Sequence, residues 1–209
     1  MTLYESQIQA ELEIWKRRMR KAPSFSSQLA KRLQIRVNRV IPEKIHQAIT
    51  LAIKQMTRAV FFGAGFTTRT PVKPESLESC ESKVIERIKF YRNTAAAEGA
   101  ITGAGGILLG LADFPIWLTL KMKMLFEIAA LYGFDVKDYR ERLYILYIFQ
   151  LAFSSQHGRT KIFMHMENWN QKLHILPEDS DSFDWKTFQQ EYRDYIDLAK
   201  MAQLLPVVG

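Results

Sequence analysis

Hydrophobic residues recur at every third or fourth position through most of the chain, with polar residues between them. In the first such segment the apolar positions are Ile8, Leu12, Trp15 and Met19. A repeat of this period places the apolar side chains on one face of an α-helix, whereas a half-buried strand alternates every second residue. No segment of the sequence alternates in that way, so the pattern predicts an all-α fold.

We expect one helical domain over residues 1–209, a bundle of about 7–9 helices around a central glycine-rich apolar segment. With 209 residues, 47% of them hydrophobic, the chain is long enough to bury one full core. The predicted parts, in chain order, are basic N-terminal helices at 1–65, a loop at 66–75, apolar core helices at 76–174, an acidic loop at 177–184 and a last helix at 185–205.

Local signals predict where several helices begin and end. Thr2 and Glu5 have the spacing of a capping box, in which each residue binds the backbone N–H of the other. Gly133 follows an apolar helix and suits the left-handed position after a helix end. Asp135 then suits the cap of the next helix. We expect a turn at residues 154–160.

The run from Ala95 to Tyr132 is the most apolar part of the sequence and holds five of the ten glycines. Gly99 and Gly103 are four residues apart, as are Gly106 and Gly110. Residues four apart share a helix face, so these small residues allow a neighbouring backbone to come close.

Glycine inside a helix costs about 1 kcal/mol relative to alanine. Five glycines therefore favour a break in the helix, either near 103–106 or at Asp113-Phe114-Pro115. At the second place Asp113 would cap a new helix, with Pro115 close to its first position.

Two interpretations of this run stay open. A membrane-spanning helix needs about 20 predominantly apolar residues, and the uncharged stretches Gly99–Ala112 and Leu143–Gln156 are too short for one. The run is then either a buried core helix in a soluble bundle, or a re-entrant or interfacial hairpin that enters a bilayer.

Charge is spread unevenly along the chain. Residues 1–92 carry 18 Lys or Arg against 8 Asp or Glu, a balance of +10, and residues 93–209 carry 11 against 14, a balance of −3. A basic half beside an apolar half indicates an anionic surface as partner. The expected basic surface comprises Lys16, Arg17, Arg18, Arg20, Lys31, Arg32 and Arg36.

Two carboxylates, Glu98 and Asp113, lie within the apolar run. A buried carboxylate must be neutral, hydrogen-bonded or paired, which makes these two side chains the first candidates for a site. The expected lipid or ligand pocket comprises Glu98, Gly99, Thr102, Gly103, Gly106, Gly110, Asp113 and Trp117.

The catalytic signals are weak. The four histidines lack the HExxH spacing of a zinc helix, so neither a metal site nor a cofactor is predicted. The glycine fingerprint of dinucleotide sites is incomplete, because Leu108 stands where its last glycine belongs. Nucleic acid is not favoured as a partner, since the cations are distributed over three helices and not gathered on one recognition helix.

Three segments carry a family resemblance: EKIHQAITLAIKQMTRAV at 43–60, AAAEGAITGAGGILLGLADFP at 95–115 and IAALYGFD at 128–135. In this order they resemble the EcsC family of bacterial helical proteins, named after a gene that lies beside those of an ABC transporter. The resemblance implies a helical protein, cytoplasmic or membrane-associated, with no established chemistry. Family members usually continue with a second glycine-rich segment, so it also implies a C-terminally truncated member.

These observations together favour a non-enzymatic, membrane-associated protein that binds an anionic lipid surface or a hydrophobic ligand. One cysteine, Cys80, and a charged N-terminus without a signal peptide indicate a cytoplasmic protein peripheral to the inner face of the cell membrane. One alternative is a soluble interaction protein, an accessory of a membrane transporter. Another is a hydrolase that uses Glu98, Asp113 and a histidine.

Overall fold

A computed structural model describes residues 1–21, 43–62, 71, 76–102, 106–178 and 180–196. Within these residues the chain forms eight α-helices, one short 3₁₀ helix and no strand, which confirms the predicted all-α fold. The helices are α1 (Leu3–Arg20), α3 (Glu43–Phe61), α4 (Leu77–Thr102), α5 (Gly106–Leu131), α6 (Tyr139–Phe153), α7 (Gln156–Glu167), α8 (Trp169–Leu173), η2 (Ser180–Ser182) and α9 (Trp185–Tyr195).

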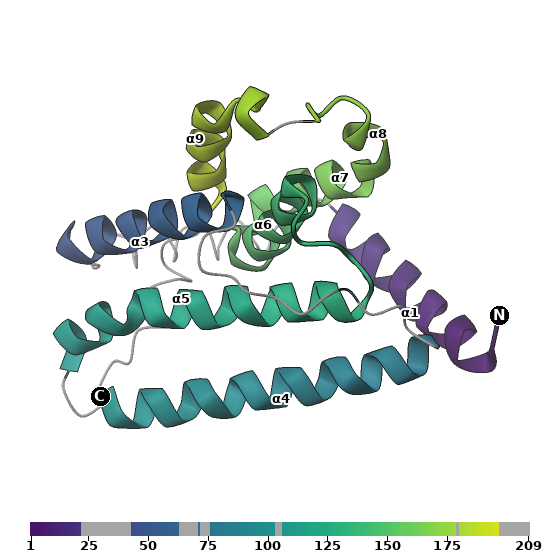
Figure 1. Ribbon diagram of the computed structural model, residues 1–209, viewed down its shortest axis with the longest axis horizontal. Coiled ribbons are helices and arrows are strands. Elements are labelled where there is room, and N and C mark those ends of the chain that lie inside the picture. The colour runs from purple at the N-terminus through teal and green to yellow at the C-terminus, as the bar shows by residue number, and fades with distance from the viewer. Residues whose placement is uncertain (22–42, 63–70, 72–75, 103–105, 179, 197–209) are drawn as a thin grey trace.

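The helix α5 lies at the centre of the arrangement (Figure 1). It runs alongside α4 on one side and contacts α3 and α6 on the other. Beyond these, α7 packs on α6, and α9 packs on α3. The first helix, α1, crosses one end of the molecule and contacts both α4 and α7. As a result α4 and α9 lie on opposite sides of the molecule.

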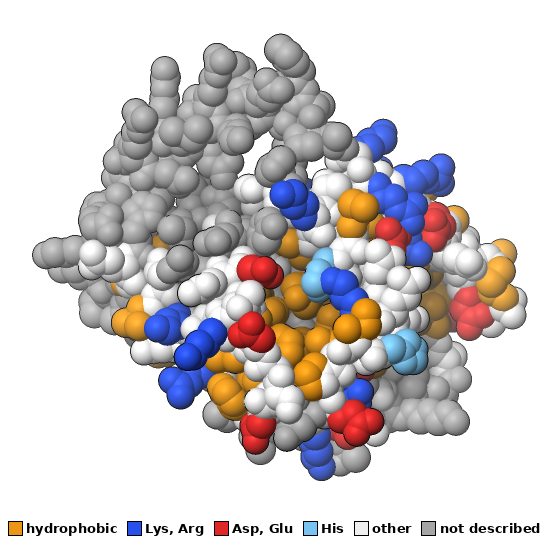
Figure 2. Space-filling model, turned by 90° about the horizontal axis from the view of Figure 1, so that it is seen from above, with side chains coloured by type: hydrophobic (Ala, Val, Ile, Leu, Met, Phe, Trp, Pro, Cys, Tyr) orange, Lys and Arg blue, Asp and Glu red, His pale blue; other side chains and the backbone are white. Residues whose placement is uncertain are grey.

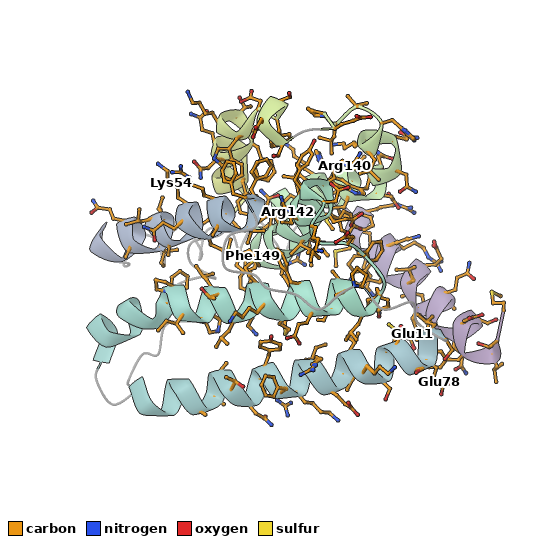
Figure 3. The ribbon with its side chains drawn as sticks, viewed as in Figure 1. Glu11, Lys54, Glu78, Arg140, Arg142 and Phe149 are labelled. Carbon is orange, nitrogen blue, oxygen red and sulfur yellow. The ribbon has the colours of Figure 1, made fainter. Side chains whose placement is uncertain are left out.

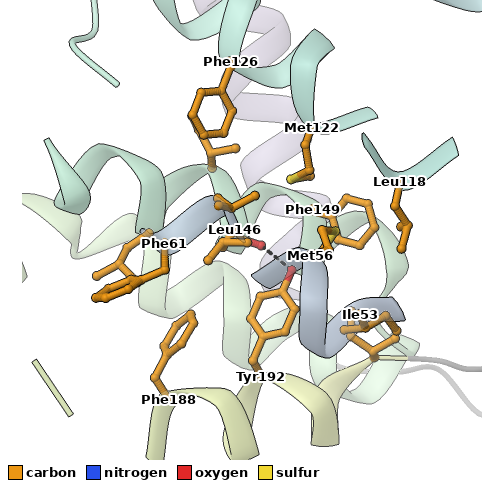
Figure 4. Packing of buried hydrophobic residues seen from close by; sticks show 14 of the residues in the cluster. Ile53, Met56, Phe61, Leu118, Met122, Phe126, Leu146, Phe149, Phe188 and Tyr192 are labelled. Atoms are coloured by element: carbon orange, nitrogen blue, oxygen red, sulfur yellow. Dashed lines mark hydrogen bonds between the residues drawn. The ribbon is translucent and has the colours of Figure 1, made fainter. Parts of the chain in front are cut away.

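The core is formed where α3, α5, α6 and α9 meet (Figure 4). In α5 the buried side chains recur every four residues, at Phe114, Leu118, Met122 and Phe126. They pack with buried residues of the other three helices, among them Ile49, Ile53, Met56, Val60, Leu143, Leu146, Phe149, Phe188 and Tyr192. For this part of the glycine-rich run, the interpretation as a core helix is confirmed. None of the described helices has both the length and the apolarity that crossing a membrane requires.

The predicted break at 103–106 agrees with the helix ends, because α4 ends at Thr102 and α5 begins at Gly106. The alternative break is wrong, since α5 continues through Asp113 and Pro115 without interruption. Proline removes one backbone hydrogen bond from a helix. Here Phe114 and Leu118, on either side of Pro115, are almost fully buried, and their packing stabilises the continuous helix.

Of the helix-end signals at Thr2, Gly133 and Asp135, two are confirmed and one is corrected. The capping box of Thr2 and Glu5 is present, with both reciprocal hydrogen bonds. Gly133 has a φ of 88° and ends α5 in a Schellman motif, in which Phe134 N–H binds the Ala129 carbonyl at 3.0 Å. The cap of α6, however, is Asp138. The predicted cap, Asp135, instead closes the preceding turn by accepting the N–H of Lys137.

Two expectations about the C-terminal third are wrong. The predicted turn at 154–160 is confined to Ser154 and Ser155, because the Ser155 hydroxyl accepts the N–H of Gly158 and caps α7. The last helix, predicted to reach residue 205, ends at Tyr195, and Ile196 forms an antiparallel bridge with the buried Ser154. Residues 197–205 lie outside the described part of the chain.

Buried polar side chains join the helices of the core. The Tyr192 hydroxyl donates to the Leu146 carbonyl at 2.9 Å, the bond drawn in Figure 4. The side-chain amide of Gln150 donates to the Tyr192 carbonyl. The guanidinium of Arg142 donates to the carbonyl of Phe61 at the end of α3 at 2.8 Å, and to carbonyls of the 136–137 turn. These bonds fix α9 on α6, and α6 on the end of α3.

Candidate functional site

The predicted lipid or ligand pocket lies at the end of the α4–α5 pair where the two helices are linked (Figure 1). Glu98, Gly99 and Thr102 are in the last turns of α4, and Gly106, Gly110 and Asp113 are in the first turns of α5. Gly103, and the side chains of residues 98–113, lie outside the described part of the chain. The backbone therefore brings these positions to one end of the hairpin, and the pocket stays a prediction.

Trp117 is the member of that set whose side chain is described. Its ring stacks on Phe114 with centroids 6.0 Å apart and meets the edge of Phe153 at 5.9 Å. The ammonium of Lys121 lies 5.5 Å from the ring centroid, a cation–π contact. Trp117 thus packs at the border between α5 and α6.

The predicted basic surface is only partly available. On α1, Lys16 pairs with Glu13 at 2.9 Å, and Arg20 forms a two-bonded ion pair with Glu167 of α7. This pair lowers the pKa of the Glu167 carboxyl. Arg17 and Arg18 are exposed and have no carboxylate partner among the described residues. Lys31, Arg32 and Arg36 lie outside the described residues.

A second basic and apolar surface, not predicted from the sequence, covers the side of α4 that faces away from α5. Cys80, Val84 and Tyr91 of α4 are buried on the inner side. Large apolar side chains also project outward, with exposed fractions of 51% at Ile85, 42% at Ile88 and 54% at Phe90. Figure 3 shows side chains of α4 pointing both toward α5 and away from it.

Exposed cations surround these apolar side chains. We define the α4 outer face as Ile85, Ile88, Lys89 and Arg92, which are all exposed and share one side of the helix at i, i+3, i+4 and i+7, whereas Lys83 and Phe90 lie on another side. Within residues 82–92 the acidic residue is Glu86. The apolar positions of this helix form two stripes on different sides, and a search for one amphipathic face misses the second stripe. The resulting surface combines exposed hydrophobic groups with positive charge.

On the opposite side of the molecule, an aromatic groove runs between α9 and the α7–α8 segment, with α6 as its floor. Tyr147 of α6 is central to it, with its ring centroid 5.8 Å from Trp169, 5.7 Å from Phe188 and 4.4 Å from His165. Two adjoining cavities, of about 350 and 200 Å³, share Tyr147, His165, Phe188 and Glu191 in their walls. Figure 2 shows the hydrophobic hollow with charged side chains around it.

The polar groups of the groove come from both walls. On one side Lys172 contacts the ring of His165, with Nζ 2.7 Å from Nε2. Burial, together with the positive charge of Lys172, lowers the pKa of His165 to about 4, and burial also lowers the pKa of Lys172. On the other side Asp184 accepts the N–H of Thr187 at 3.2 Å and caps α9. The exposed Glu191 completes that rim.

The described residues contain no group of three or more His, Cys, Asp or Glu side chains placed to hold a metal ion. His165 lies in the aromatic groove and His174 is exposed, whereas the side chains of His46 and His157 lie outside the described part. Cys80 is buried, and its thiol donates to the Leu131 carbonyl at 3.3 Å. The hydrolase alternative therefore gains no assembled set of catalytic groups from the described residues.

Comparison with known proteins agrees with the sequence resemblance. The model of the EcsC protein family matches residues 6–209. The chain belongs to the EcsC family. It is 45% identical to Protein EcsC of Bacillus subtilis (strain 168), over the whole chain and 86% of that relative. It is also 33% identical to the uncharacterized protein YdbA of the same organism, over 58% of this chain and 44% of that relative. No solved structure matches the chain.

Proposed function

We propose that this EcsC-family protein is a non-enzymatic, peripheral membrane protein that binds anionic lipid through the α4 outer face. The observation that carries the proposal is the placement of Ile85 and Ile88, exposed on one side of α4 beside Lys89 and Arg92. Helices that lie on a membrane bury apolar side chains in the boundary between headgroups and acyl chains, and their lysines and arginines extend to the phosphates.

The position of α4 in the fold supports this orientation. Among the described helices, α4 contacts α5 and α1, and its outer side faces away from both (Figure 1). An outermost helix can lie flat on a surface without any change in the core. We place the contact at the inner face of the cell membrane, because anionic lipids give the cytoplasmic leaflet a negative surface potential.

The basic end of α1 lies elsewhere. Its Arg20 is bound to Glu167 of α7, and its Trp15 packs against Phe163, also of α7, with ring centroids 5.3 Å apart. The opposite end of α1 contacts α4, where the Tyr4 hydroxyl donates to Glu81. Arg17 and Arg18 are therefore separated from the α4 outer face by most of the length of α1, and they provide a matched control.

The test is flotation with vesicles of phosphatidylcholine alone and of phosphatidylcholine mixed with phosphatidylglycerol. The protein is expected to float with the anionic vesicles and to stay behind with the neutral ones. Replacing two cations in Lys89→Gln/Arg92→Gln removes about 1 kcal/mol each, which weakens binding about 30-fold. Arg17→Gln/Arg18→Gln changes the net charge by the same amount and is expected to bind nearly as well as the wild type.

Loss of binding in the α1 variant instead would assign the contact to α1 and contradict the role of α4. Equal flotation with both kinds of vesicle would contradict the electrostatic part of the proposal. Failure to float with either kind would contradict the membrane proposal and favour an interaction protein, in which the same exposed side chains contact another protein.

A further inference from the structure

The aromatic groove between α9 and the α7–α8 segment has the size and composition of a small-molecule site. Its larger cavity, of about 350 Å³, is lined by Leu143, Trp169, Leu176, Phe183 and Phe188 as well as by polar residues. Ligand sites typically have volumes of about 300–1,000 Å³, mainly apolar walls and a few convergent polar groups. The groove lies on the side of the molecule opposite α4, so it is separate from the proposed membrane contact.

Two hydrogen-bond donors, the Tyr147 hydroxyl and the Trp169 indole N–H, belong to residues in its wall. Within the described part of the chain, neither the Tyr147 hydroxyl nor the Trp169 indole N–H forms a hydrogen bond to the protein. Neither atom is fully buried, because Glu127 Oε2 is the buried side-chain polar atom without a partner among the described residues, so water reaches both donors. Trp169 is 8% exposed, and Tyr147 is half-buried beneath His165 and Phe188. Both donors therefore remain available to a bound acceptor.

Lys172 lines the same cavity as Tyr147 and Trp169. The ammonium of Lys172 has three N–H donors and contacts both ring nitrogens of His165, with Nζ 2.7 Å from Nε2. The described residues place no carboxylate within ion-pair distance of Lys172. On the opposite rim Asp184 is occupied as a helix cap, and Glu191 is exposed and can turn toward water. Glu191 nevertheless acts electrostatically on both Lys172 and Tyr147, so this exposed carboxylate balances part of the positive charge on the donor side of the groove.

We propose that the aromatic groove binds a free single-chain fatty acid, with its carboxylate at Lys172, Tyr147 and Trp169 and its chain along Leu143, Leu176, Phe183 and Phe188. A carboxylate can accept from Tyr147 and Trp169 in place of water, and its charge is opposite to that of Lys172. The aliphatic chain covers apolar walls that are otherwise in contact with water. A single chain suits the cavity, whereas a phospholipid with two chains needs more room.

The test is isothermal titration calorimetry on the purified full chain with three ligands of equal chain length. Decanoate is expected to bind, decanol to bind more weakly, and decyltrimethylammonium to bind least. Lys172→Gln is expected to weaken decanoate binding about tenfold, the size of a lost charge-assisted hydrogen bond, and to leave decanol unaffected. Lys123→Gln, which removes an exposed lysine of α5, is the control and should bind decanoate as the wild type does.

A second variant separates the site from folding. Tyr147→Phe keeps the ring and its packing and removes the hydroxyl, so it is expected to weaken decanoate binding several-fold while circular dichroism and the urea midpoint stay close to the wild type. Three results would overturn the proposal: no heat with decanoate, unchanged decanoate affinity in Lys172→Gln, or tighter binding of decyltrimethylammonium. The last would assign the groove to a cationic ligand held by Glu191. The vesicle experiment does not test the aromatic groove, and the calorimetry does not test the α4 outer face. Failure of one proposal is therefore distinguishable from failure of the other.

Discussion

The Tyr91 hydroxyl donates a 2.9 Å hydrogen bond to Glu127 Oε1, and this bond joins the middle of α4 to the C-terminal part of α5. The other carboxylate oxygen, Oε2, is buried without a hydrogen-bond partner among the described residues, and Arg87 Nε lies 3.4 Å from it. One carboxylate is thus held between a phenol and a guanidinium at a helix interface. The helix α4, which forms one side of this interface, also carries the α4 outer face proposed to contact lipid.

Tyr91→Phe is expected to lower the free energy of unfolding by about 1–2 kcal/mol, because Glu127 loses its hydrogen bond while it stays partly buried. Urea unfolding followed by circular dichroism measures the loss. Tyr91→Phe/Glu127→Leu removes both partners and should recover part of the stability. A double variant less stable than the sum of the two single changes would contradict this account.

Arg142→Lys is expected to destabilise the protein by several kcal/mol. Lysine keeps the positive charge but lacks the planar fork that reaches the Phe61, Val136 and Lys137 carbonyls together. Buried acceptors left without a donor cost about 1–3 kcal/mol each. The urea midpoint of Arg142→Lys should fall well below that of Arg140→Lys, whose side chain pairs with Asp138 at the surface. Similar midpoints for the two variants would contradict the stabilising role of the Arg142 hydrogen bonds.

The stability of the protein should fall as the pH decreases from 6.5 toward 4. His165 has a pKa lowered from 6.5 to about 4, so between these values the unfolded chain binds a proton that the folded protein does not. The contribution of the neutral ring is complete above pH 6.5 and is lost by about pH 4. Urea unfolding of His165→Gln at several pH values should show a shallower decline, whereas a variant of the exposed His174 should decline as the wild type does. Parallel curves for wild type and His165→Gln would refute the prediction.

Two neighbouring positions on α6 test the core. Leu146 is 0% exposed, and Leu146→Ala is expected to cost about 2–5 kcal/mol through lost burial and the cavity left behind. Ile148 is 36% exposed, and Ile148→Ala should cost less than half as much. Thermal unfolding of both variants measures the difference. Equal costs would mean that α6 presents a different face to the core.

The parts of the fold that depend on near neighbours in the sequence could be predicted from it. The capping box of Thr2 and Glu5 and the left-handed Gly133 involve residues a few positions apart, and both are present. Asp113 and Pro115 have equally clear local signals for a helix start. There the burial of Phe114 and Leu118 against other helices outweighs the local preference, and a single sequence does not show that packing.

The candidate sites were harder to predict for the same reason. The aromatic groove takes Tyr147 from α6, His165 from α7, Lys172 from α8 and Phe188 from α9, so no continuous motif marks it. The α4 outer face was not predicted because α4 is apolar on two sides, and a search for a single amphipathic face does not find the second. The charge count drew attention to the N-terminal half, but it could not show that Arg20 is bound to Glu167.

The position of α5 has a consequence for any model in which the glycine-rich hairpin enters a bilayer. Between Phe114 and Ala130 this helix packs against α3 and α6 on one side and against α4 on the other, and its buried side chains belong to the core. Lipid tails could replace these neighbours only after the helices had separated, which means dismantling the same interior that keeps the protein folded. Insertion of α5 would therefore be a slow, all-or-none refolding event, whereas adsorption through α4 leaves the interior intact and is readily reversed.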